Sequence, residues 1–301
     1  MGLILITGGT GFLGRAVLEK FSDQRVIAPN RLMLDLLDQQ AVNNYFDEKE
    51  ITGVIHCAAS CGGISLNKKQ PATLAYENAV MGLNLLEAAK NKGVEKFINI
   101  GTICSYGENC PTPFKEEYLG SELPEPTNRQ YGLVKFILGE LGKAYKEEFG
   151  LNFVQIMPVN MLGAFDNHGT KSHVVPAIIE KIDKALENDS KVELLGTGTS
   201  TREFVCNRDV ADFIRLAWDT INQAAPINVG TGKTIKISEL AEKIAVKMGY
   251  NKGFDYNGKL DGQKQRRLDI SRAKSFGWEP KTTLDEMLDQ EILYYRTVVK
   301  I

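Results

Sequence analysis

The chain has 301 residues, of which 43% are hydrophobic and 25% are charged. A chain of this length and composition buries one large core or two smaller ones, which excludes the fibrous and disordered classes. Its 36 basic and 38 acidic residues leave a formal charge of -2, so no overall field draws it to nucleic acid or to an anionic membrane. We expect neither of these partners.

The first apolar run, Leu3 to Ile6, ends at Gly8 and is too short for a signal peptide, and no run of membrane-spanning length follows. The cysteines are odd in number and lack zinc-type spacing. They are Cys57, Cys61, Cys104, Cys110 and Cys206. This pattern favours free thiols in a reducing compartment. We expect a cytoplasmic protein without a bound metal.

The first half of the chain alternates short β-branched runs with amphipathic stretches. Strands are expected at residues 3–7, 25–28, 53–57, 96–101 and 152–157, and helices at residues 12–21, 39–46, 72–91 and 129–149. Strands that are apolar on both faces and alternate with helices are typical of a parallel sheet covered on both sides. The sequence therefore predicts an α/β fold of the Rossmann type with a doubly wound parallel sheet.

After Pro158 the pattern changes to loops and shorter helices, which are expected at residues 173–186, 209–221 and 238–248. We interpret residues 1–158 as a dinucleotide-binding domain and residues 159–301 mainly as a smaller, substrate-binding lobe. Asn228-Val229-Gly230 has the character of one more strand of the first sheet. A segment near 205–235 is therefore expected to return to the first domain.

A Gly-x-x-Gly-x-x-Gly run follows the first strand and opens the first helix, at Gly8, Gly11 and Gly14. Glycines there permit a tight turn and let the backbone approach a pyrophosphate at the positive N-terminal end of the helix. The run predicts dinucleotide binding. The expected cofactor contacts are Gly8, Thr10, Gly11, Phe12, Leu13, Arg31, Asp35, Leu36, Ala58, Ala59, Lys135, Pro158, Asn160 and His173.

The end of the second strand indicates which dinucleotide is bound. An acidic residue there would hydrogen-bond a ribose 2′-hydroxyl and repel a 2′-phosphate. This chain has Ala28-Pro29-Asn30-Arg31 instead. Because a guanidinium forms charge-assisted hydrogen bonds with phosphate, the segment favours NADP(H) over NAD(H). A solvated surface arginine is the alternative interpretation of Arg31.

Tyr131 and Lys135 lie one helical turn apart on the same face of a predicted helix. A cation that close is expected to lower the pKa of the phenol, so that Tyr131 exchanges a proton with a sugar oxygen near neutral pH. Thr102 follows a predicted strand and offers a hydroxyl to the same oxygen. The set resembles the hydroxyl, Tyr and Lys catalytic residues of the short-chain dehydrogenase/reductase superfamily.

Two further residues indicate chemistry beyond hydride transfer. Cys104 lies two positions after Thr102, so in an extended segment both side chains face the same way. His173 precedes Val174 at the start of a predicted helix. A buried apolar thiol and a helix-capping imidazole are the alternative interpretations.

Within the extended branch of that superfamily, the chain resembles the GDP-L-fucose synthase family, which are GDP-4-keto-6-deoxy-mannose 3,5-epimerase-4-reductases. The resemblance runs from residue 1 to about residue 280. The matching stretches are residues 34–38, 62–64, 101–106, 125–128, 157–160, 172–176, 202–204 and 261–262.

The resemblance implies NADPH-dependent 3,5-epimerisation and 4-reduction of a GDP-4-keto-6-deoxy sugar. A ketone at C4 acidifies the hydrogens at C3 and C5, so a base and an acid can invert each centre through an enolate. The matching positions make Cys104 the base and His173 the acid, while Tyr131 protonates the C4 oxygen during reduction. The implied substrate contacts are Thr102, Asn160, Arg202 and Asp261. Dimerisation through the helices at 72–91 and 129–149 is expected by analogy.

The chain departs from the family pattern at several positions near the sugar nucleotide. Thr102 replaces the usual serine, and Leu195, residues 206–209 and residues 263–267 also differ. Two alternatives therefore stay open: a 4-reductase without epimerisation, and an epimerase-reductase acting on a GDP-4-keto-6-deoxy-heptose.

Three further classes are less favoured. A sugar-nucleotide 4,6-dehydratase would carry Asp-Glu where this chain has Ile103-Cys104. An NAD-dependent sugar-nucleotide 4-epimerase would keep its cofactor bound and recycle it. A non-catalytic NADPH sensor would not need the Tyr131 and Lys135 pair.

Overall fold

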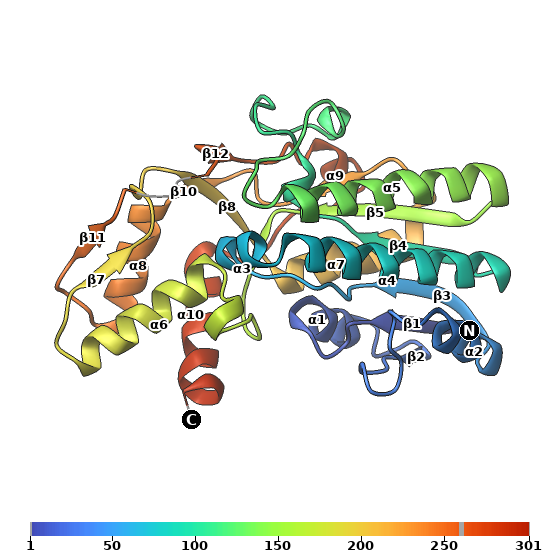
Figure 1. The fold of residues 1–301 in the computed structure, drawn as a ribbon, viewed down its shortest axis with the longest axis horizontal. Helices are drawn as coiled ribbons and strands as arrows, with labels where there is room; N and C mark the ends of the chain where they lie inside the picture. Colours follow the sequence, from blue (N-terminus) through green and yellow to red (C-terminus); the bar gives the residue numbers. More distant parts are fainter. Residues whose placement is uncertain (1, 259–261, 301) are drawn as a thin grey trace.

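The computed structural model describes residues 2–258 and 262–300. Figure 1 shows a layered α/β domain beside a smaller lobe that is built from the second half of the chain. The predicted fold class, a doubly wound parallel sheet with a smaller lobe, is confirmed. Among the described residues, no helix is both long and apolar enough to cross a membrane.

The central sheet has six parallel strands in the order β2-β1-β3-β4-β5-β9. Their bounds are β1 Leu3–Thr7, β2 Val26–Ile27, β3 Ile51–His56, β4 Lys96–Ile100, β5 Asn152–Pro158 and β9 Ile227–Val229. The strand order reverses at β1, which has β2 on one side and β3 on the other. In such sheets a crevice opens at the carboxyl ends of the strands where the order reverses.

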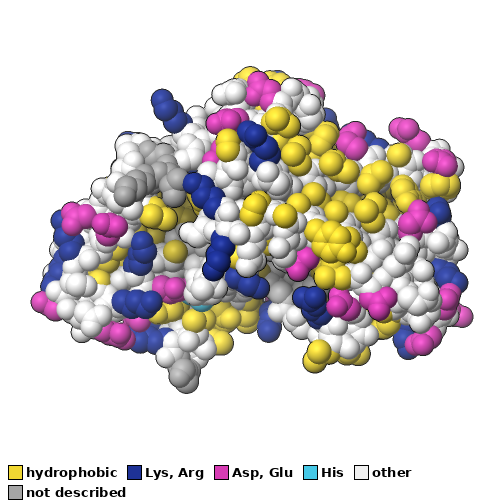
Figure 2. Space-filling model, viewed as in Figure 1, with side chains coloured by type: hydrophobic (Ala, Val, Ile, Leu, Met, Phe, Trp, Pro, Cys, Tyr) yellow, Lys and Arg dark blue, Asp and Glu magenta, His cyan; other side chains and the backbone are white. Residues whose placement is uncertain are grey.

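Helices cover both faces of this sheet. The helices α1 (Phe12–Lys20) and α7 (Asn207–Thr220) pack together on one face. The other face is covered by α2 (Gln39–Glu48), α4 (Pro71–Asn91) and α5 (Arg129–Phe149). On the view in Figure 2, hydrophobic side chains gather over α4 and α5.

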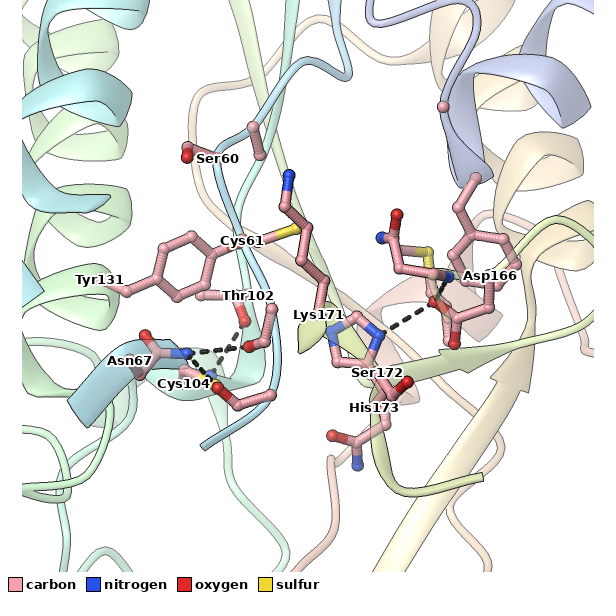
Figure 3. Close-up of a pocket in the computed structure, with 18 of the residues that line it drawn as sticks. Ser60, Cys61, Asn67, Thr102, Cys104, Tyr131, Asp166, Lys171, Ser172 and His173 are labelled. Atoms are coloured by element: carbon pink, nitrogen blue, oxygen red, sulfur yellow. Dashed lines mark hydrogen bonds and ion pairs between the residues drawn. The ribbon is translucent and has the colours of Figure 1, made fainter. Parts of the chain in front are cut away.

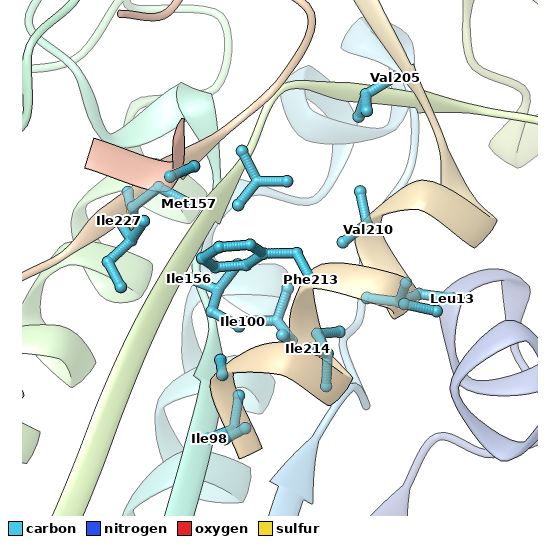
Figure 4. Close-up of a cluster of buried hydrophobic side chains, with 14 of the residues drawn as sticks. Leu13, Ile98, Ile100, Ile156, Met157, Val205, Val210, Phe213, Ile214 and Ile227 are labelled. Atoms are coloured by element: carbon cyan, nitrogen blue, oxygen red, sulfur yellow. The ribbon is translucent and has the colours of Figure 1, made fainter. Parts of the chain in front are cut away.

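The strands bury alternate residues toward the two layers of helices. Ile4 and Ile6 pack toward α1 and α7, whereas Leu5 packs toward α2 and α4. Figure 4 shows Phe213 of α7 at the centre of the first of these cores, among side chains of β4 and β5. Its ring meets Trp278 edge-on at 5.4 Å. Trp278, which comes late in the chain, is thereby attached to the core of the first domain.

The smaller lobe has its own hydrophobic core between three helices. These are α6 (Val174–Glu187), α8 (Ile237–Met248) and α10 (Leu284–Tyr294). Its strands form one sheet in which β8 pairs with β6, β10 and β12, and a second sheet of β7 and β11. Their bounds are β6 Asn160–Leu162, β7 Val192–Leu194, β8 Thr201–Cys206, β10 Thr234–Lys236, β11 Phe254–Tyr256 and β12 Gln265–Arg266.

Chain order interleaves the two parts. After β8 the chain returns to the central sheet through α7 and β9, and β9 pairs with β5 at Ile156 to Pro158. The expected returning segment near 205–235 falls on these elements. Several helices have no counterpart in the sequence-based expectations. They include α10, the short helices α3 (Ile64–Lys69) and α9 (Ser271–Ser275), and the 3-10 turn η1 (Ile103–Ser105).

Candidate active site

A cavity of about 950 Å³ lies at the carboxyl ends of β1, β3, β4 and β5, bounded on its far side by residues of the lobe. Every residue predicted for catalysis, cofactor binding or substrate binding lines this cavity, except Asp261. Asp261 lies outside the described residues. The fold therefore brings together residues that are spread from Gly8 to Arg202 in the sequence.

The turn between β1 and α1 forms one end of the cavity. Gly8 has a φ of 70° and its carbonyl accepts a hydrogen bond from Gly11 N at 2.9 Å. A Cβ on Gly14 would lie 2.0 Å from Gly8 O, so a side chain there would block the turn. No side chain caps the N-terminus of α1. Its backbone N–H groups can therefore bind the pyrophosphate of a dinucleotide.

Arg31 lies in the loop after β2, and 70% of its side chain is exposed. Its Nε is 3.6 Å from Asp35 Oδ2, and both residues line the cavity. An exposed pair of this kind contributes little to stability. Arg31 can therefore exchange this contact for a phosphate at low cost, and the residues of this loop fit a dinucleotide with a 2′-phosphate.

Thr102, Tyr131 and Lys135 occupy one wall of the cavity. Thr102 follows β4, and its Oγ1 accepts a hydrogen bond from Cys104 N at 3.2 Å. Tyr131 and Lys135 project from α5, and Lys135 Nζ donates to Ile100 O at 3.0 Å. Burial lowers the pKa of Lys135 to about 8.

The pKa of Tyr131 differs from the sequence-based expectation. Burial raises this pKa well above its usual value, and the nearby thiols of Cys61 and Cys104 raise it further. The ammonium of Lys135 is directed to the carbonyl of Ile100 and does not offset this burial. Tyr131 is therefore held as a neutral phenol, which is the form that donates a proton.

Cys104 receives two hydrogen bonds on its sulfur. Asn128 Nδ2 lies 3.3 Å and Arg266 Nη1 lies 3.5 Å from Cys104 Sγ. Arg266 is itself buried and donates from Nη2 to Glu125 Oε2 at 2.6 Å. A cation and an amide beside a thiol stabilise negative charge on the sulfur.

His173 lies across the cavity from these residues (Figure 3), at the N-terminus of α6. Its Nδ1 is 3.0 Å from Asp166 Oδ1, and 39% of its side chain is exposed whereas that of Asp166 is buried. Burial lowers the pKa of His173, but the hydrogen bond and the charge of Asp166 outweigh burial and raise it above 6.5. The imidazole is therefore held in a form that can deliver a proton.

The two other predicted substrate contacts are fixed by the backbone of the lobe. Asn160 Nδ2 donates to Glu203 O at 2.8 Å, and Arg202 Nη1 donates to Thr201 O and Gln263 O, each at 2.8 Å. Both side chains line the cavity. Their orientation is set before any ligand arrives.

Sequence reasoning missed five residues that shape this site. Glu125, Asn128 and Glu203 lie within quoted family stretches, whereas Asp166 and Arg266 do not. Glu203 is fully buried and its carboxylate accepts from Thr231 N, Gly232 N and Leu268 N at 2.6 to 2.7 Å. The signal in the sequence that could have identified Glu203 was its position between Arg202 and Phe204, within a quoted stretch.

The fold and this set of residues define a dinucleotide-dependent enzyme of the short-chain dehydrogenase/reductase type. The sequence model described as the NAD dependent epimerase/dehydratase family matches residues 4–230. The chain is 34% identical over 287 residues to the GDP-L-fucose synthase of Sinorhizobium fredii, covering 94% of this chain and 91% of that protein. It is 33% identical over 299 residues to the GDP-L-colitose synthase of Yersinia pseudotuberculosis, covering 97% of each. The chain belongs to the NAD dependent epimerase/dehydratase family and, within it, to the family of the GDP-L-fucose synthases.

Solved structures agree with this assignment. The GDP-mannoheptose C4 reductase from Campylobacter jejuni with NADP bound superposes with a TM-score of 0.86 at 26% identity, covering 98% of both chains. The predicted family and the predicted fold are thus confirmed. The roles of individual site residues stay predictions.

The Asp166 contact gives a first testable prediction. Replacing Asp166 by Asn removes the charge that opposes burial, so the pKa of His173 falls below 6.5. Asp255→Asn, which alters an exposed carboxylate paired with Lys191, is the control and leaves the pKa of His173 unchanged. Both are measured by NMR titration of the imidazole signals. An unchanged His173 pKa in the Asp166 variant would contradict the assigned contact.

Proposed function

We propose that the protein catalyses the NADPH-dependent 3,5-epimerisation and 4-reduction of a GDP-4-keto-6-deoxy sugar. The observation that carries this proposal is that Cys104 and His173 face one cavity together with Thr102, Tyr131 and Lys135. The groups needed for proton exchange at carbon and for proton donation to oxygen therefore lie in one site. The names of the relatives, GDP-L-fucose synthase and GDP-L-colitose synthase, support a GDP-linked sugar.

Epimerisation needs a base and an acid on different sides of the sugar ring. Cys104 as thiolate removes the hydrogen from C3 or C5, with Asn128 and Arg266 stabilising its charge before the transfer. His173, whose pKa is raised by the hydrogen bond and charge of Asp166 against the effect of burial, returns a proton to the opposite face of the same carbon. The negative charge of the intermediate enolate rests on the C4 oxygen, where the hydroxyls of Thr102 and Tyr131 can donate hydrogen bonds.

Reduction follows at C4. NADPH, when bound at the turn between β1 and α1, supplies the hydride for this step. The phenol of Tyr131 donates its proton to the C4 oxygen, and its raised pKa ensures that this proton is present. Lys135 is buried in the same wall of the cavity, where its ammonium is anchored to Ile100 O.

A second candidate function is 4-reduction without epimerisation. The likeness to a GDP-mannoheptose C4 reductase favours it. The same likeness, together with Leu195 lining the cavity where the family pattern differs, favours a heptose as an alternative sugar. The donors on the sulfur of Cys104 and the Asp166–His173 contact favour the bifunctional reaction, because a reductase needs neither.

The test is an incubation of the purified protein with GDP-4-keto-6-deoxy-mannose and NADPH in deuterated water. The absorbance of NADPH reports cofactor oxidation, and NMR of the product locates deuterium. We expect oxidation with deuterium at C3 and C5. Oxidation without deuterium at either carbon would establish the simple reductase, and failure to oxidise NADPH would direct the search to a 4-keto heptose.

Two variants separate the carbon chemistry from a structural effect. Cys104→Ser and His173→Gln should each lower deuterium incorporation by about 10²- to 10⁴-fold, the range for general acid–base groups. Cys110→Ser is the matched control, because Cys110 is a buried thiol outside the cavity. Incorporation that survives in both site variants would exclude the assigned roles.

Arg31 gives a prediction about cofactor choice. Replacing it by Ala removes charge-assisted hydrogen bonds to the 2′-phosphate, which are worth about 1.5–3 kcal/mol. The KM for NADPH should therefore rise about 10- to 100-fold, while the KM for NADH changes little. Steady-state kinetics with both cofactors checks this. An equal change in the KM for both cofactors would indicate that Arg31 is a solvated surface residue.

We also propose a homodimer formed through α4 and α5. Four large hydrophobic side chains on these helices are exposed, Tyr76 by 65%, Leu83 by 40%, Ile137 by 50% and Phe149 by 48%. Figure 2 shows further hydrophobic atoms around this surface. Ile137→Glu should convert the dimer to a monomer in light scattering after size-exclusion chromatography. The control is Val246→Glu on α8, at an exposed position outside these helices. A monomeric wild-type protein would contradict the proposal.

We further propose that the protein works in the cytoplasm. All five cysteines are free thiols in the structure. A reducing compartment maintains thiols in this form, and Cys104 has to stay unoxidised to act as a base in its thiolate form.

A further inference from the structure

His168 lies five residues before His173 and outside the cavity. Its side chain is buried, and each ring nitrogen meets a carboxylate from a different helix. Nδ1 is 2.9 Å from Glu180 Oε1 of α6, and Nε2 is 2.8 Å from Glu291 Oε1 of α10. A histidine donates from both nitrogens only as an imidazolium. The geometry is therefore that of one cation between two acids.

The same carboxylate of Glu180 also binds the first residue of η3 (Gly169–Lys171) and the residue that follows this turn. Its Oε1 accepts from Gly169 N at 2.7 Å and from Ser172 Oγ at 2.9 Å. Ser172 is the residue directly before His173. Glu291, on the other helix, is fully buried. The loop from His168 to Ser172 is thus held between α6 and α10 by charged contacts.

The start of this loop is also constrained. Phe165 has a φ of 77°, a left-handed backbone conformation that is rare for a residue with a bulky side chain. Its ring lies between Arg15 of α1, at 4.9 Å, and Tyr294 of α10, at 5.1 Å. Asp166 follows directly and holds His173. Both members of the Asp166–His173 pair therefore lie on a loop that is tied to α10.

We propose that His168 is a positioning residue, which as an imidazolium between Glu180 and Glu291 fixes the loop 166–173 and so aligns His173 with the cavity. Its consequence for catalysis rests on the proposed function, whereas the clamp itself is a property of the fold. We call His168, Glu180 and Glu291 the histidine clamp.

The histidine clamp depends on pH in a defined direction. The groups that face His168 are Glu180 from α6, Glu291 from α10, and the rings of Tyr294 and Tyr295, while Asp166 faces Glu291. Burial lowers the pKa of His168, but Glu291 and Glu180 outweigh it and raise the pKa above 6.5. The stabilisation from the charge of His168 is present below about pH 6.5 and is lost as pH rises through the pKa of folded His168. Burial raises the pKa of Glu291, so the charged contact also weakens at low pH where Glu291 takes up a proton.

NMR titration tests the clamp without any assay of activity. The chain has three histidines, His56, His168 and His173, so each imidazole signal can be assigned with single variants. In His168→Gln the loop loosens, and the pKa of His173 falls back toward 6.5 because its contact with Asp166 weakens. Lys243→Met, which removes an exposed contact to Asp285 of α10, is the control and leaves it unchanged. An unchanged His173 pKa in His168→Gln would overturn the proposal.

A second variant covers the case in which His168→Gln fails to fold. In Glu180→Gln, the amide oxygen of the new side chain still accepts from Gly169 N and Ser172 Oγ, but the charge is removed. The pKa of His173 should therefore fall, by less than in His168→Gln. An unchanged pKa in this folded variant would equally overturn the clamp.

A second experiment tests the effect on catalysis by measuring deuterium incorporation as a function of pH. Misplacing a catalytic group by about 1 Å lowers the rate by up to about 100-fold. Deuterium incorporation in His168→Gln should therefore fall on the order of tenfold to 100-fold. The decline of incorporation at high pH should also no longer follow the titration of His168. Incorporation at the wild-type level with an unchanged pH profile would contradict positioning. If wild-type protein incorporates no deuterium, the proposed function fails, and the titration still decides the clamp.

Discussion

The reversal of strand order between β1 and β3 is the constraint on which the rest of the structure depends. Parallel strands end at one edge of the sheet, and where their connections leave in opposite directions no helix covers that edge. The glycine turn after β1, the ends of β3 and β4, and the return of the chain from β5 all meet there. One cavity can therefore hold a dinucleotide and a second molecule beside it.

The chemistry at this cavity comes from two parts of the chain that face each other. The first domain supplies Thr102 and Tyr131, and the lobe supplies His173 and Arg266. Burial acts differently on the two sides. It raises the pKa of Tyr131, whereas at His173 the adjacent carboxylate of Asp166 outweighs burial and raises the pKa of the imidazole. Glu203, buried beneath the lobe wall, binds three backbone N–H groups and so fixes the strands that present Arg266.

The sequence was informative where structure is local. The helix at residues 129–149 was predicted with its observed bounds, because its apolar spacing is regular and Gly150 ends it in a left-handed conformation. The strands β6, β7, β10 and β11 have three residues each, too few for alternation to appear. In the site, Tyr131 and Lys135 were found by spacing, whereas Arg266 and Glu125 meet across 141 positions and had no local signal.

We propose that one cavity performs proton exchange at C3 and C5 first and reduction at C4 second. It is tested most directly by Tyr131→Phe, followed in deuterated water with a GDP-4-keto-6-deoxy sugar and NADPH. The account predicts that cofactor oxidation falls by about 10²- to 10⁴-fold while deuterium still enters the sugar at C3 and C5, because Cys104 and His173 remain. Oxidation at the wild-type rate, or loss of exchange as complete as the loss of oxidation, would contradict it.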